Sequence, residues 1–390
     1  MRDLAALQQL VGQSVQSIDT PALVIDLDAM ERNLARMQSY ANAQGTKLRP
    51  HAKMHKSAAL SKLQMQAGAV GVCVQKVSEA AALAAQGVSD IYISNVVSSL
   101  QKCEHLAHIL CRLQGENASK IRLSVATDSL LGIRHLAQAV ARIAPSDVMD
   151  VFIEIDVGQA RCGVEPGAAA VPLAEAIAKH ASLRFAGLQA YHGRAQHLRG
   201  AAQRREAIAQ VIGQVQLTTS VLKAAGFDVP LVTGAGTGSF IHEASSGVYG
   251  ELQAGSYLFM DADYAANERT EDMPPFEHAL FVKSQVISRH TTASDDRAVI
   301  DAGHKSHAID SGLPTIWQGH QADWQFSNGG DEHGILRGKR LPELGDVVWL
   351  IPGHCDPTVN LHDAMMGVRG GLSSGVVESI IEVTTRGCVQ

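Results

Sequence analysis

An imidazole and a primary amine lie close together in the segment KLRPHAKMHK (47–56), at His51 and Lys53. The segment opens with alternating apolar and charged residues, which indicates the end of a β-strand, so both side chains are expected on one face. An amine that loses hydration in a cavity is costly to charge, and we therefore expect the pKa of Lys53 to fall. A neutral amine could form a Schiff base with a carbonyl compound. The alternative is that Lys53 is only a solvated cation at the end of the strand. Two other lysines, Lys56 and Lys76, are expected at helix starts, where they would point sideways to the barrel axis.

A glycine-rich segment, TGAGTGSF (233–240), follows a later apolar run. Glycines let backbone N–H groups converge on an anion, although a structural turn would use the same residues. The next run ends in AGSY (254–257), which adds the hydroxyl groups of Ser256 and Tyr257 and favours a phosphate site. A lysine amine near a phosphate site suggests pyridoxal 5′-phosphate, because the amine can hold its aldehyde while the loop holds its phosphate.

The segment PGHCDPTVN (352–360) carries an imidazole and a carboxylate separated by one residue. In an extended chain His354 and Asp356 would point the same way while Cys355 points away. Two such ligands with open positions suit a divalent cation that keeps waters, Mn²⁺ or Mg²⁺ more than structural Zn²⁺, although the pair could also be accidental. Two further segments offer possible ligands, and each could instead be a solvated turn or loop: GDEHG (330–334) and HKSHAIDSG (304–312).

Eight short apolar runs, mostly separated by helical patterns, would position these residues. The predicted strands are 47–53, 69–75, 90–95, 121–126, 151–157, 185–193, 230–236 and 249–261, and the predicted helices are 28–45, 56–68, 77–87, 98–114, 128–144, 167–181 and 201–226. Near-continuous apolar strands alternating with helices favour a closed (β/α)₈ barrel of the TIM type. No GxGxxG follows the first strand, which weakens a dinucleotide-binding interpretation.

The pattern changes after about residue 265, where strands follow one another through turns with no helix between them. We therefore predict an α/β protein with a barrel over 20–265 and a C-terminal antiparallel β domain over 266–390, which could include residues 1–19. The strand ALVIDL (22–27) could join either part.

The working residues of such a barrel lie at the C-terminal ends of its strands. The residues at the C-terminal ends of the predicted strands are Lys53, Gln75, Asn95, Asp156, Tyr191, His192 and the loop Gly234–Gly238. This collection is more polar than the structural end of a barrel needs.

The composition and net charge of the chain disfavour several classes of protein. The chain has 390 residues, of which 46% are hydrophobic and 18% charged, and its net charge of −6 disfavours nucleic-acid or anionic-membrane partners. No apolar run reaches the roughly 18 residues that a membrane span needs, and we identify no signal peptide. Six scattered cysteines without a CxxC pair favour reduced thiols in a cytoplasmic protein over a disulfide framework.

Several longer motifs together resemble one family. They are, in order, RPHAK, QKVSEA, EIDVGQARCGV, GLQAYHG, TGAGTGSF, LQAGSYLFMD, DSGLP, GDEHG and PGHCDPTVN. This series is similar to the D-threonine aldolase group of fold-type III pyridoxal-phosphate enzymes, whose wider relatives are alanine racemase and D-serine dehydratase. The resemblance runs from about residue 19 to the end of the chain. It implies a homodimer with active sites near the subunit contact.

The resemblance also assigns roles to single residues. Lys53 matches the Schiff-base lysine, and His354 and Asp356 match the ligands of the divalent metal. The residues expected around the cofactor ring are Gln75, Arg161 and Tyr191, and those on the phosphate side are Gly236, Thr237, Ser256 and Tyr257. Two positions depart from the family: Ala235 replaces the middle residue of a triple glycine, and His304 stands where an apolar residue is expected at the substrate mouth.

The implied reaction is reversible cleavage of a D-β-hydroxy-α-amino acid to glycine and an aldehyde, with His51 or His192 as a possible proton shuttle. A D-serine or D-threo-3-hydroxyaspartate dehydratase is an alternative, but the related dehydratases have a cysteine where Asp356 stands. A β-hydroxyaspartate aldolase, giving glycine and glyoxylate, is a nearer alternative, since Arg194 or His197 could bind the extra carboxylate. A carrier that binds the cofactor without turnover is an alternative from a different class.

Overall fold

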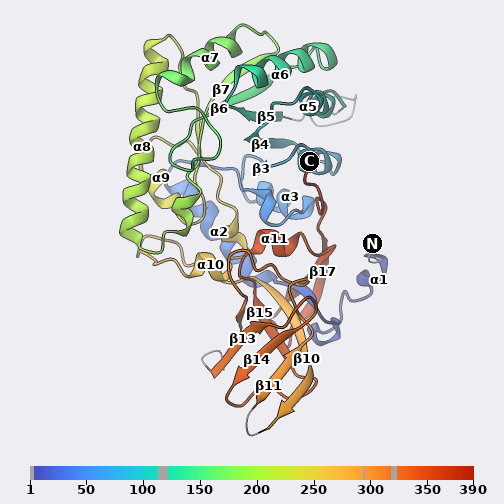
Figure 1. Cartoon of the computed structure of the whole chain (residues 1–390). Coiled ribbons are helices and arrows are strands. Elements are labelled where there is room, and N and C mark those ends of the chain that lie inside the picture. The colour runs from blue at the N-terminus through green and yellow to red at the C-terminus, as the bar shows by residue number, and fades with distance from the viewer. Residues whose placement is uncertain (1–3, 113–121, 293–294, 318–322) are drawn as a thin grey trace.

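The computed structural model describes residues 4–112, 122–292, 295–317 and 323–390 (Figure 1). Eight parallel strands form one sheet in the order β2-β9-β8-β7-β6-β5-β4-β3. Their bounds are β2 (Lys47–Leu48), β3 (Val72–Val74), β4 (Asp90–Val96), β5 (Arg122–Thr127), β6 (Met149–Glu154), β7 (Leu183–Ala190), β8 (Val232–Gly234) and β9 (Glu251–Leu252). The chain after β2 meets β3 through a parallel bridge between His51 and Cys73, so the two edges of the curled sheet come together. The predicted barrel of eight strands is confirmed.

Helices cover the outside of this sheet, as the alternation of patterns predicts. They are α2 (Leu27–Ala43), α3 (Ala58–Gln66), α4 (Val77–Ala85), α5 (Leu100–Arg112), α6 (Leu130–Ile143), α7 (Val171–Ala178), α8 (Ala201–Ala224), α9 (Phe240–Ser245) and α10 (Ala262–Ala265). In α6, Ile133, Leu136 and Val140 recur at helical spacing and are fully buried against the sheet. The predicted helix over 98–114 and strand over 121–126 extend into residues 113–121, which lie outside the described residues.

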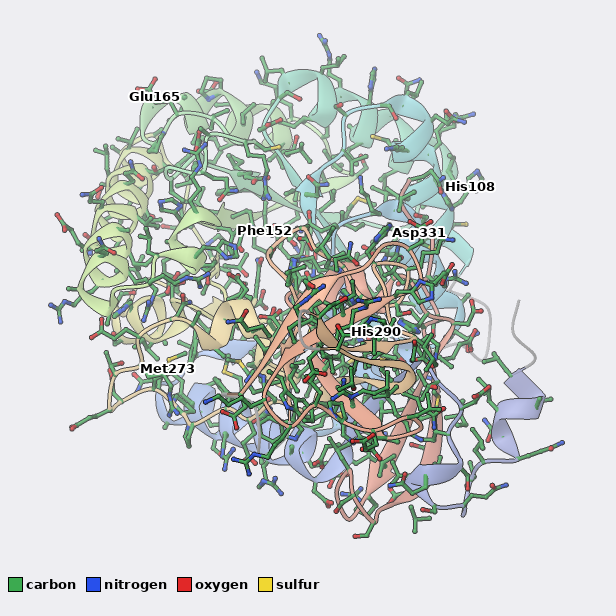
Figure 2. The ribbon with its side chains drawn as sticks, turned by 60° about the horizontal axis from the view of Figure 1, so that its bottom comes forward. His108, Phe152, Glu165, Met273, His290 and Asp331 are labelled. Atoms are coloured by element: carbon green, nitrogen blue, oxygen red, sulfur yellow. The ribbon has the colours of Figure 1, made fainter. Side chains whose placement is uncertain are left out.

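The interior of the barrel holds a small group of its own. Phe152 packs there with Tyr92, at 4.8 Å between ring centroids, while the neighbouring Val151 and Ile153 of β6 join the outer core instead. Figure 2 looks from the side of the C-terminal part and labels Phe152 behind it. Because side chains alternate along a strand, Glu154 follows Phe152 on the inner face and lies nearer the carboxyl end of the barrel.

The first barrel strand is shorter than predicted. β2 ends at Leu48, and Pro50 has no N–H to extend the ladder. The chain then forms a 3₁₀ turn, η2 (Ala52–Met54), with His51 as its N-cap residue. His51 and Lys53 therefore do not share one face of a strand, and the turn carries Lys53 toward the mouth of the barrel.

A second sheet contains the C-terminal strands and one strand from the beginning of the chain. Its strands are β1 (Ala22–Asp26), β10 (Leu280–Thr291), β11 (Asp296–Ile300), β12 (Thr315–Ile316), β13 (Trp324–Asn328), β14 (Gly334–Gly338), β15 (Val347–Ile351), β16 (Ala364–Arg369) and β17 (Val376–Glu382). The main order is β13-β14-β11-β10-β1-β16-β17, and β1 pairs antiparallel with β10 and parallel with β16. The predicted antiparallel domain is present, and β1, for which the sequence left both parts open, pairs with its strands.

In the part of the chain that the structure describes, an α-helix interrupts the C-terminal strands, contrary to the prediction that no helix lies between them. α11 (Cys355–Val359) follows β15 and lies where the two parts of the molecule meet (Figure 1). It contacts the turn η2 of the barrel. This position brings residues 300 positions apart in the sequence into one place. Among the helices of the described residues, none is long and apolar enough to cross a bilayer.

Candidate active site

A cavity of about 210 Å³ lies at the carboxyl ends of the barrel strands. Most of the residues predicted for the site line it: His51, Lys53, Gln75, Arg161, Tyr191, Gly236, Thr237, Ser256 and Asp356. Sequence analysis missed four further polar lining residues: Ser94, Gln189, Gln253 and Tyr264. The first three lie inside predicted strands, and in the structure they lie near or just after the carboxyl ends of β4, β7 and β9, where alternation along the strand could have identified them.

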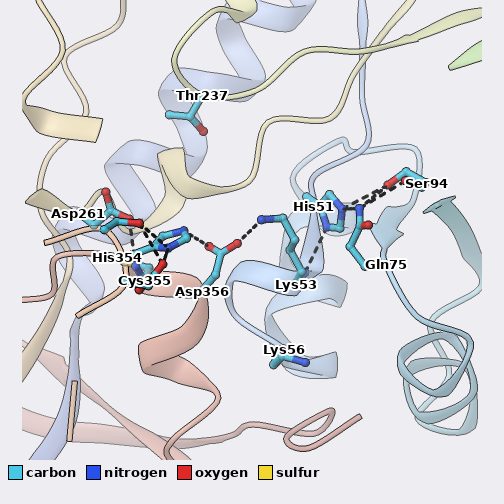
Figure 3. Close-up of polar contacts among 12 residues, drawn as sticks. His51, Lys53, Lys56, Gln75, Ser94, Thr237, Asp261, His354, Cys355 and Asp356 are labelled. Atoms are coloured by element: carbon cyan, nitrogen blue, oxygen red, sulfur yellow. Dashed lines mark hydrogen bonds and ion pairs between the residues drawn. The ribbon is translucent and has the colours of Figure 1, made fainter. Parts of the chain in front are cut away.

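Lys53 faces a carboxylate from the other part of the molecule. Its ammonium group forms an ion pair with Asp356 Oδ2, and Figure 3 shows Asp356 between Lys53 and His354. Burial favours the neutral amine, but the Asp356 carboxylate outweighs burial and raises the pKa of Lys53. The expectation that this pKa falls is therefore wrong, because sequence analysis considered loss of hydration without the carboxylate. The same ion pair outweighs burial at Asp356 and lowers its pKa to about 2.

The rival lysines are placed away from the cavity. Lys56 is buried and its Nζ lies 2.6 Å from Glu79 Oε1, within a network that also holds the start of α4. Lys76 is the N-cap residue of α4. Neither residue lines the cavity, so Lys53 is the amine that a bound carbonyl compound would meet.

His51 is buried with both ring nitrogens engaged (Figure 3). Nδ1 accepts from the backbone N–H of Lys53 at 3.3 Å, and Nε2 lies 2.8 Å from Gln75 Nε2 and 3.2 Å from Ser94 Oγ. Burial, assisted by the nearby ammonium of Lys53, keeps the pKa of His51 well below its usual value. A neutral ring with both nitrogens occupied favours a positioning role over proton transfer.

The loop after β8 offers unpaired donors to the cavity. Gly236 and Thr237 are buried, and within the described residues neither backbone N–H has a hydrogen-bond acceptor. Thr237 Oγ1 accepts from the backbone N–H of Tyr257 at 3.0 Å. Ala235 has a φ of 70°, a region that glycine enters more readily, and its side chain lines the cavity. Two buried N–H groups without partners are the donors that a bound anion would need.

His354 and Asp356 meet through a helix rather than an extended segment. His354 is the N-cap residue of α11 and Asp356 lies in its first turn, with 3.7 Å between His354 Nε2 and Asp356 Oδ1. Cys355 is fully buried elsewhere, as predicted, and its backbone N–H donates to Asp261 Oδ2 at 3.0 Å. The expected extended geometry is thus wrong, although it led to the correct pairing of the two side chains.

The pair has free coordinating atoms and a supporting carboxylate. Asp356 Oδ1 is buried without a hydrogen-bond partner among the described residues. His354 Nδ1 lies 2.9 Å from Asp310 Oδ2 and 3.3 Å from Ser311 Oγ, which leaves Nε2 directed toward Asp356. Burial lowers the pKa of His354, but the carboxylates of Asp356 and Asp310 outweigh it and raise this pKa. Sequence analysis missed the role of Asp310, although the motif DSGLP contains it.

The described residues contain no group of three or more His, Cys, Asp or Glu side chains arranged to hold a metal ion. In the segment GDEHG, Asp331 pairs with His304 at 2.9 Å and with Lys305, while Glu332 pairs with Lys305. These contacts connect the turn between β13 and β14 to the segment that follows β11, and His304 does not line the cavity. Among the described residues, His354 and Asp356 therefore remain the candidate pair of metal ligands.

Several residues proposed from the sequence do not line the cavity, and one of them is His354, which contacts the lining residue Asp356. Tyr257 is fully buried and its hydroxyl accepts from Gln64 Nε2 at 3.1 Å, so only its backbone reaches the loop after β8. His192 has a buried Nδ1 without a partner among the described residues. Arg194 lies in the turn η4 (Arg194–His197), and His197 Nδ1 lies 2.6 Å from Asp263 Oδ2.

This chain has an eight-stranded barrel that is joined to a β domain. A lysine and a loop that can accept an anion lie at the mouth of the barrel. These features define the alanine racemase class of fold. Residues 25–263 match the family model of the alanine racemase N-terminal domain, and residues 279–368 match a model described as a serine dehydratase domain. The chain belongs to the alanine racemase N-terminal domain family.

Relatives at about 40% identity are named as aldolases. The chain is 40% identical to the 3-hydroxy-D-aspartate aldolase of Paracoccus denitrificans, over 97% of this chain and 95% of that protein. It is 41% identical to the D-threonine aldolase of Arthrobacter sp., over 96% and 95%. The crystal structure of D-threonine aldolase from Filomicrobium marinum superposes with a TM-score of 0.91 at 44% identity, covering 97% of this chain and 99% of that one. A D-threo-3-hydroxyaspartate dehydratase of Delftia sp. is more distant, at 30% identity over 88% and 92%.

Proposed function

We propose that this protein is an aldolase that cleaves a D-β-hydroxy-α-amino acid of the D-threonine type to glycine and an aldehyde, using pyridoxal phosphate and a divalent cation. One observation carries the proposal: Asp356 lines the same cavity as Lys53, and its carboxylate contacts both the Lys53 amine and the ring of His354, which lies outside the cavity lining. The sequence identity to aldolases of D-amino acids supports the same reaction class.

The cavity fits pyridoxal phosphate. Lys53 would hold the aldehyde carbon, and the buried N–H groups of Gly236 and Thr237 would hold the phosphate, because they have no acceptor among the described residues. Arg161 lies 6.0 Å from the centroid of the Tyr191 ring, and both residues would flank the pyridine ring. When bound, the cofactor supplies an electron sink for the electron pair left by the broken bond.

Asp356 and its neighbour His354 fit a hard divalent ion. His354 Nε2 and Asp356 Oδ1, which has no hydrogen-bond partner among the described residues, are one nitrogen and one oxygen donor, a set that suits Mn²⁺ or Mg²⁺ with several waters. A bound ion would lower the pKa of a substrate hydroxyl. A carboxylate at position 356 favours activation of that hydroxyl over its departure, and Cys355, the nearby thiol, is buried away from the cavity.

The side chains of this chain would orient the substrate between these two sites. The ordered ring of His51, held by Gln75 and Ser94, forms one wall and excludes bulky groups from the space next to Lys53. Asp356 contacts the Lys53 ammonium, so its carboxylate would stabilise this amine in its protonated form whenever the amine is free. The Tyr191 and Tyr264 hydroxyls also reach the cavity and stay protonated, because burial raises the pKa of each.

The absorbance spectrum tests cofactor capture. We expect the wild-type protein, mixed with pyridoxal phosphate, to develop the visible band of a Schiff base that borohydride reduction fixes to a peptide containing Lys53. Lys53→Ala should lack this band, whereas Lys56→Ala should keep it, because Lys56 pairs with Glu79 outside the cavity. A band that survives in Lys53→Ala contradicts the proposal.

Product analysis tests the reaction. With D-threonine we expect glycine and acetaldehyde, formed in the presence of Mn²⁺ or Mg²⁺ and lost on chelation. Ammonia with a keto acid would identify a dehydratase, and an unchanged substrate beside a normal Schiff-base spectrum would identify a carrier without turnover.

A β-hydroxyaspartate substrate is the second candidate. One relative at 40% identity is named for that activity, and Arg161 is an exposed guanidinium on the cavity wall without an ion-pair partner among the described residues. Arg194 and His197, suggested for the extra carboxylate, do not line the cavity. A comparison of kcat/KM for D-threonine and 3-hydroxy-D-aspartate decides between the two substrates.

The proposed homodimer is tested separately by light scattering of the purified protein.

A further inference from the structure

Gln196 is a fully buried polar residue to which neither the sequence nor the proposed reaction assigns a role. It lies in the turn η4 after β7 and packs against the loop after β8. Its Oε1 accepts from the backbone N–H of Gly238 at 2.9 Å, and its Nε2 donates to Ser239 Oγ at 2.7 Å. The two ends of one amide therefore hold two consecutive residues of this loop.

The amide is itself fixed by neighbouring groups. Asn267 Nδ2 donates to the backbone oxygen of Gln196 at 2.8 Å, and Gln196 Nε2 also donates to the backbone oxygen of His192 at 3.2 Å. Ser239 Oγ donates onward to Glu243 Oε1 at 2.8 Å. Hydrogen bonds inside a buried network are costly to break, so the position of Gln196 is well determined.

The hydrogen bond between the Gly238 N–H and Gln196 Oε1 leaves the backbone N–H groups of the two preceding residues as the free donors of the loop. Of three consecutive backbone N–H groups, the one at Gly238 is occupied by Gln196, while those of Gly236 and Thr237 have no acceptor among the described residues. A Cβ at Gly236 would lie 2.4 Å from Gln196 Oε1, so the close packing of this amide explains the glycine. The loop is pressed against Gln196 on one side and presents its free donors to the cavity on the other.

We propose that Gln196 is a positioning residue that holds the loop Gly236–Ser239 in the shape in which its free N–H groups bind the phosphate of the cofactor. Gln196 does not line the cavity and would act only through the loop. The inference rests on the proposed function, because it takes the bound anion to be the phosphate of pyridoxal phosphate.

The test compares two ligands that differ only in the phosphate. The full-length protein, freed of cofactor, is titrated with pyridoxal phosphate and with pyridoxal, and Schiff-base absorbance gives both affinities. For Gln196→Met, which keeps the side-chain length but removes both amide contacts, we expect about tenfold weaker binding of pyridoxal phosphate and unchanged binding of pyridoxal. The matched control is Gln38→Met, a buried glutamine of α2 whose Nε2 donates to Asn42 Oδ1 at 2.9 Å. This control should leave both affinities unchanged.

Ser239→Ala provides a milder variant, used in place of Gln196→Met if that protein does not fold. It removes one contact of Gln196 and leaves the one to Gly238, so we expect a smaller, roughly threefold, loss that is again confined to pyridoxal phosphate. Equal losses for the two ligands, or no loss in either variant, overturn the positioning role of Gln196 and leave the proposed function intact. A wild-type protein that binds neither ligand contradicts the proposed function and removes this inference with it.

Discussion

At the scale of single residues, the site depends on pairs of groups that change each other's ionisation. Burial alone would make Lys53 a neutral amine and Asp356 a neutral acid, yet each keeps the other charged. The sequence separates these two residues by 303 positions, so no local pattern could connect them. Spacing could identify Lys53 as a residue at the barrel mouth, but only the fold supplies its partner.

The support of His354 by Asp310 gives a prediction at this scale. Carboxylates that bind the second nitrogen of a ligating histidine fix its tautomer and raise its basicity. We expect Asp310→Asn to weaken Mn²⁺ binding by about tenfold, and Asp310→Ala to weaken it further. Isothermal titration with Mn²⁺ measures both values in the absence of substrate.

The chain contains a matched control for that substitution. His304, which follows β11, and Asp331, in the turn between β13 and β14, form a pair with the same separation, 2.9 Å, outside the cavity. Asp331→Asn should therefore leave the Mn²⁺ affinity unchanged. An equal loss of Mn²⁺ affinity in Asp331→Asn would instead place the GDEHG segment in the metal site. An unchanged Mn²⁺ affinity in Asp310→Asn would show that His354 does not need the support of Asp310.

At the scale of elements, the periodic segments were predictable and the short irregular ones were not. The eight barrel strands follow from apolar runs of β-branched residues, and helices such as α6 and α8 follow from their length and apolar spacing. By contrast, η2 and α11, which carry Lys53 and Asp356, are only one turn long. A single turn buries too few residues to leave a periodic pattern, so tertiary packing determines its conformation.

The short helix α9 carries a second prediction. Glu243 is buried, and its Oε2 has no hydrogen-bond partner among the described residues. Burial raises its pKa to about 7 from an ordinary value of 4.5. The folded protein thus holds this proton more tightly than the unfolded chain does, so stability falls as the pH rises from about 4.5 to about 7.

Glu243→Gln removes this titration and keeps an acceptor for Ser239. We expect the variant to gain stability relative to the wild type between pH 5 and pH 8, by roughly 3 kcal/mol. Urea denaturation at the two pH values measures the difference, with the exposed Glu165→Gln as a control that should show none. A wild-type protein that gains stability relative to Glu243→Gln over this range would contradict the assignment.

At the scale of the whole molecule, the two parts are linked through the beginning of the chain. β1 pairs with both β10 and β16, and the chain then enters the barrel through α2. Lys283 of β10, only 2% exposed, donates to the backbone oxygens of Val15 and Ile18 at 3.0 and 2.6 Å. The pattern of ALVIDL predicts a buried strand but does not indicate its neighbours, because register with strands some 260 to 340 residues away leaves no local signal.

Deletion of residues 1–26 tests this linkage. Leu23, Val24 and Ile25 are fully buried, and their removal costs on the order of 5 kcal/mol of apolar burial, comparable to the whole stability of many domains. It also leaves β10 and β16 as unpaired edges and deprives the ammonium of Lys283 of its acceptors, so we expect a protein that aggregates and shows no cooperative thermal transition.

Deletion of residues 1–8 is the matched control, because it removes α1 (Leu4–Gln8) but none of the backbone oxygens that Lys283 binds. That protein should remain monodisperse and melt within a few degrees of the full-length chain. Because α11 follows β15 of the same sheet, loss of β1 should also remove Mn²⁺ binding, while the shorter deletion keeps it. If the chain without residues 1–26 melted like the full-length protein and bound Mn²⁺ equally well, β1 would be dispensable for holding the barrel and the β domain together.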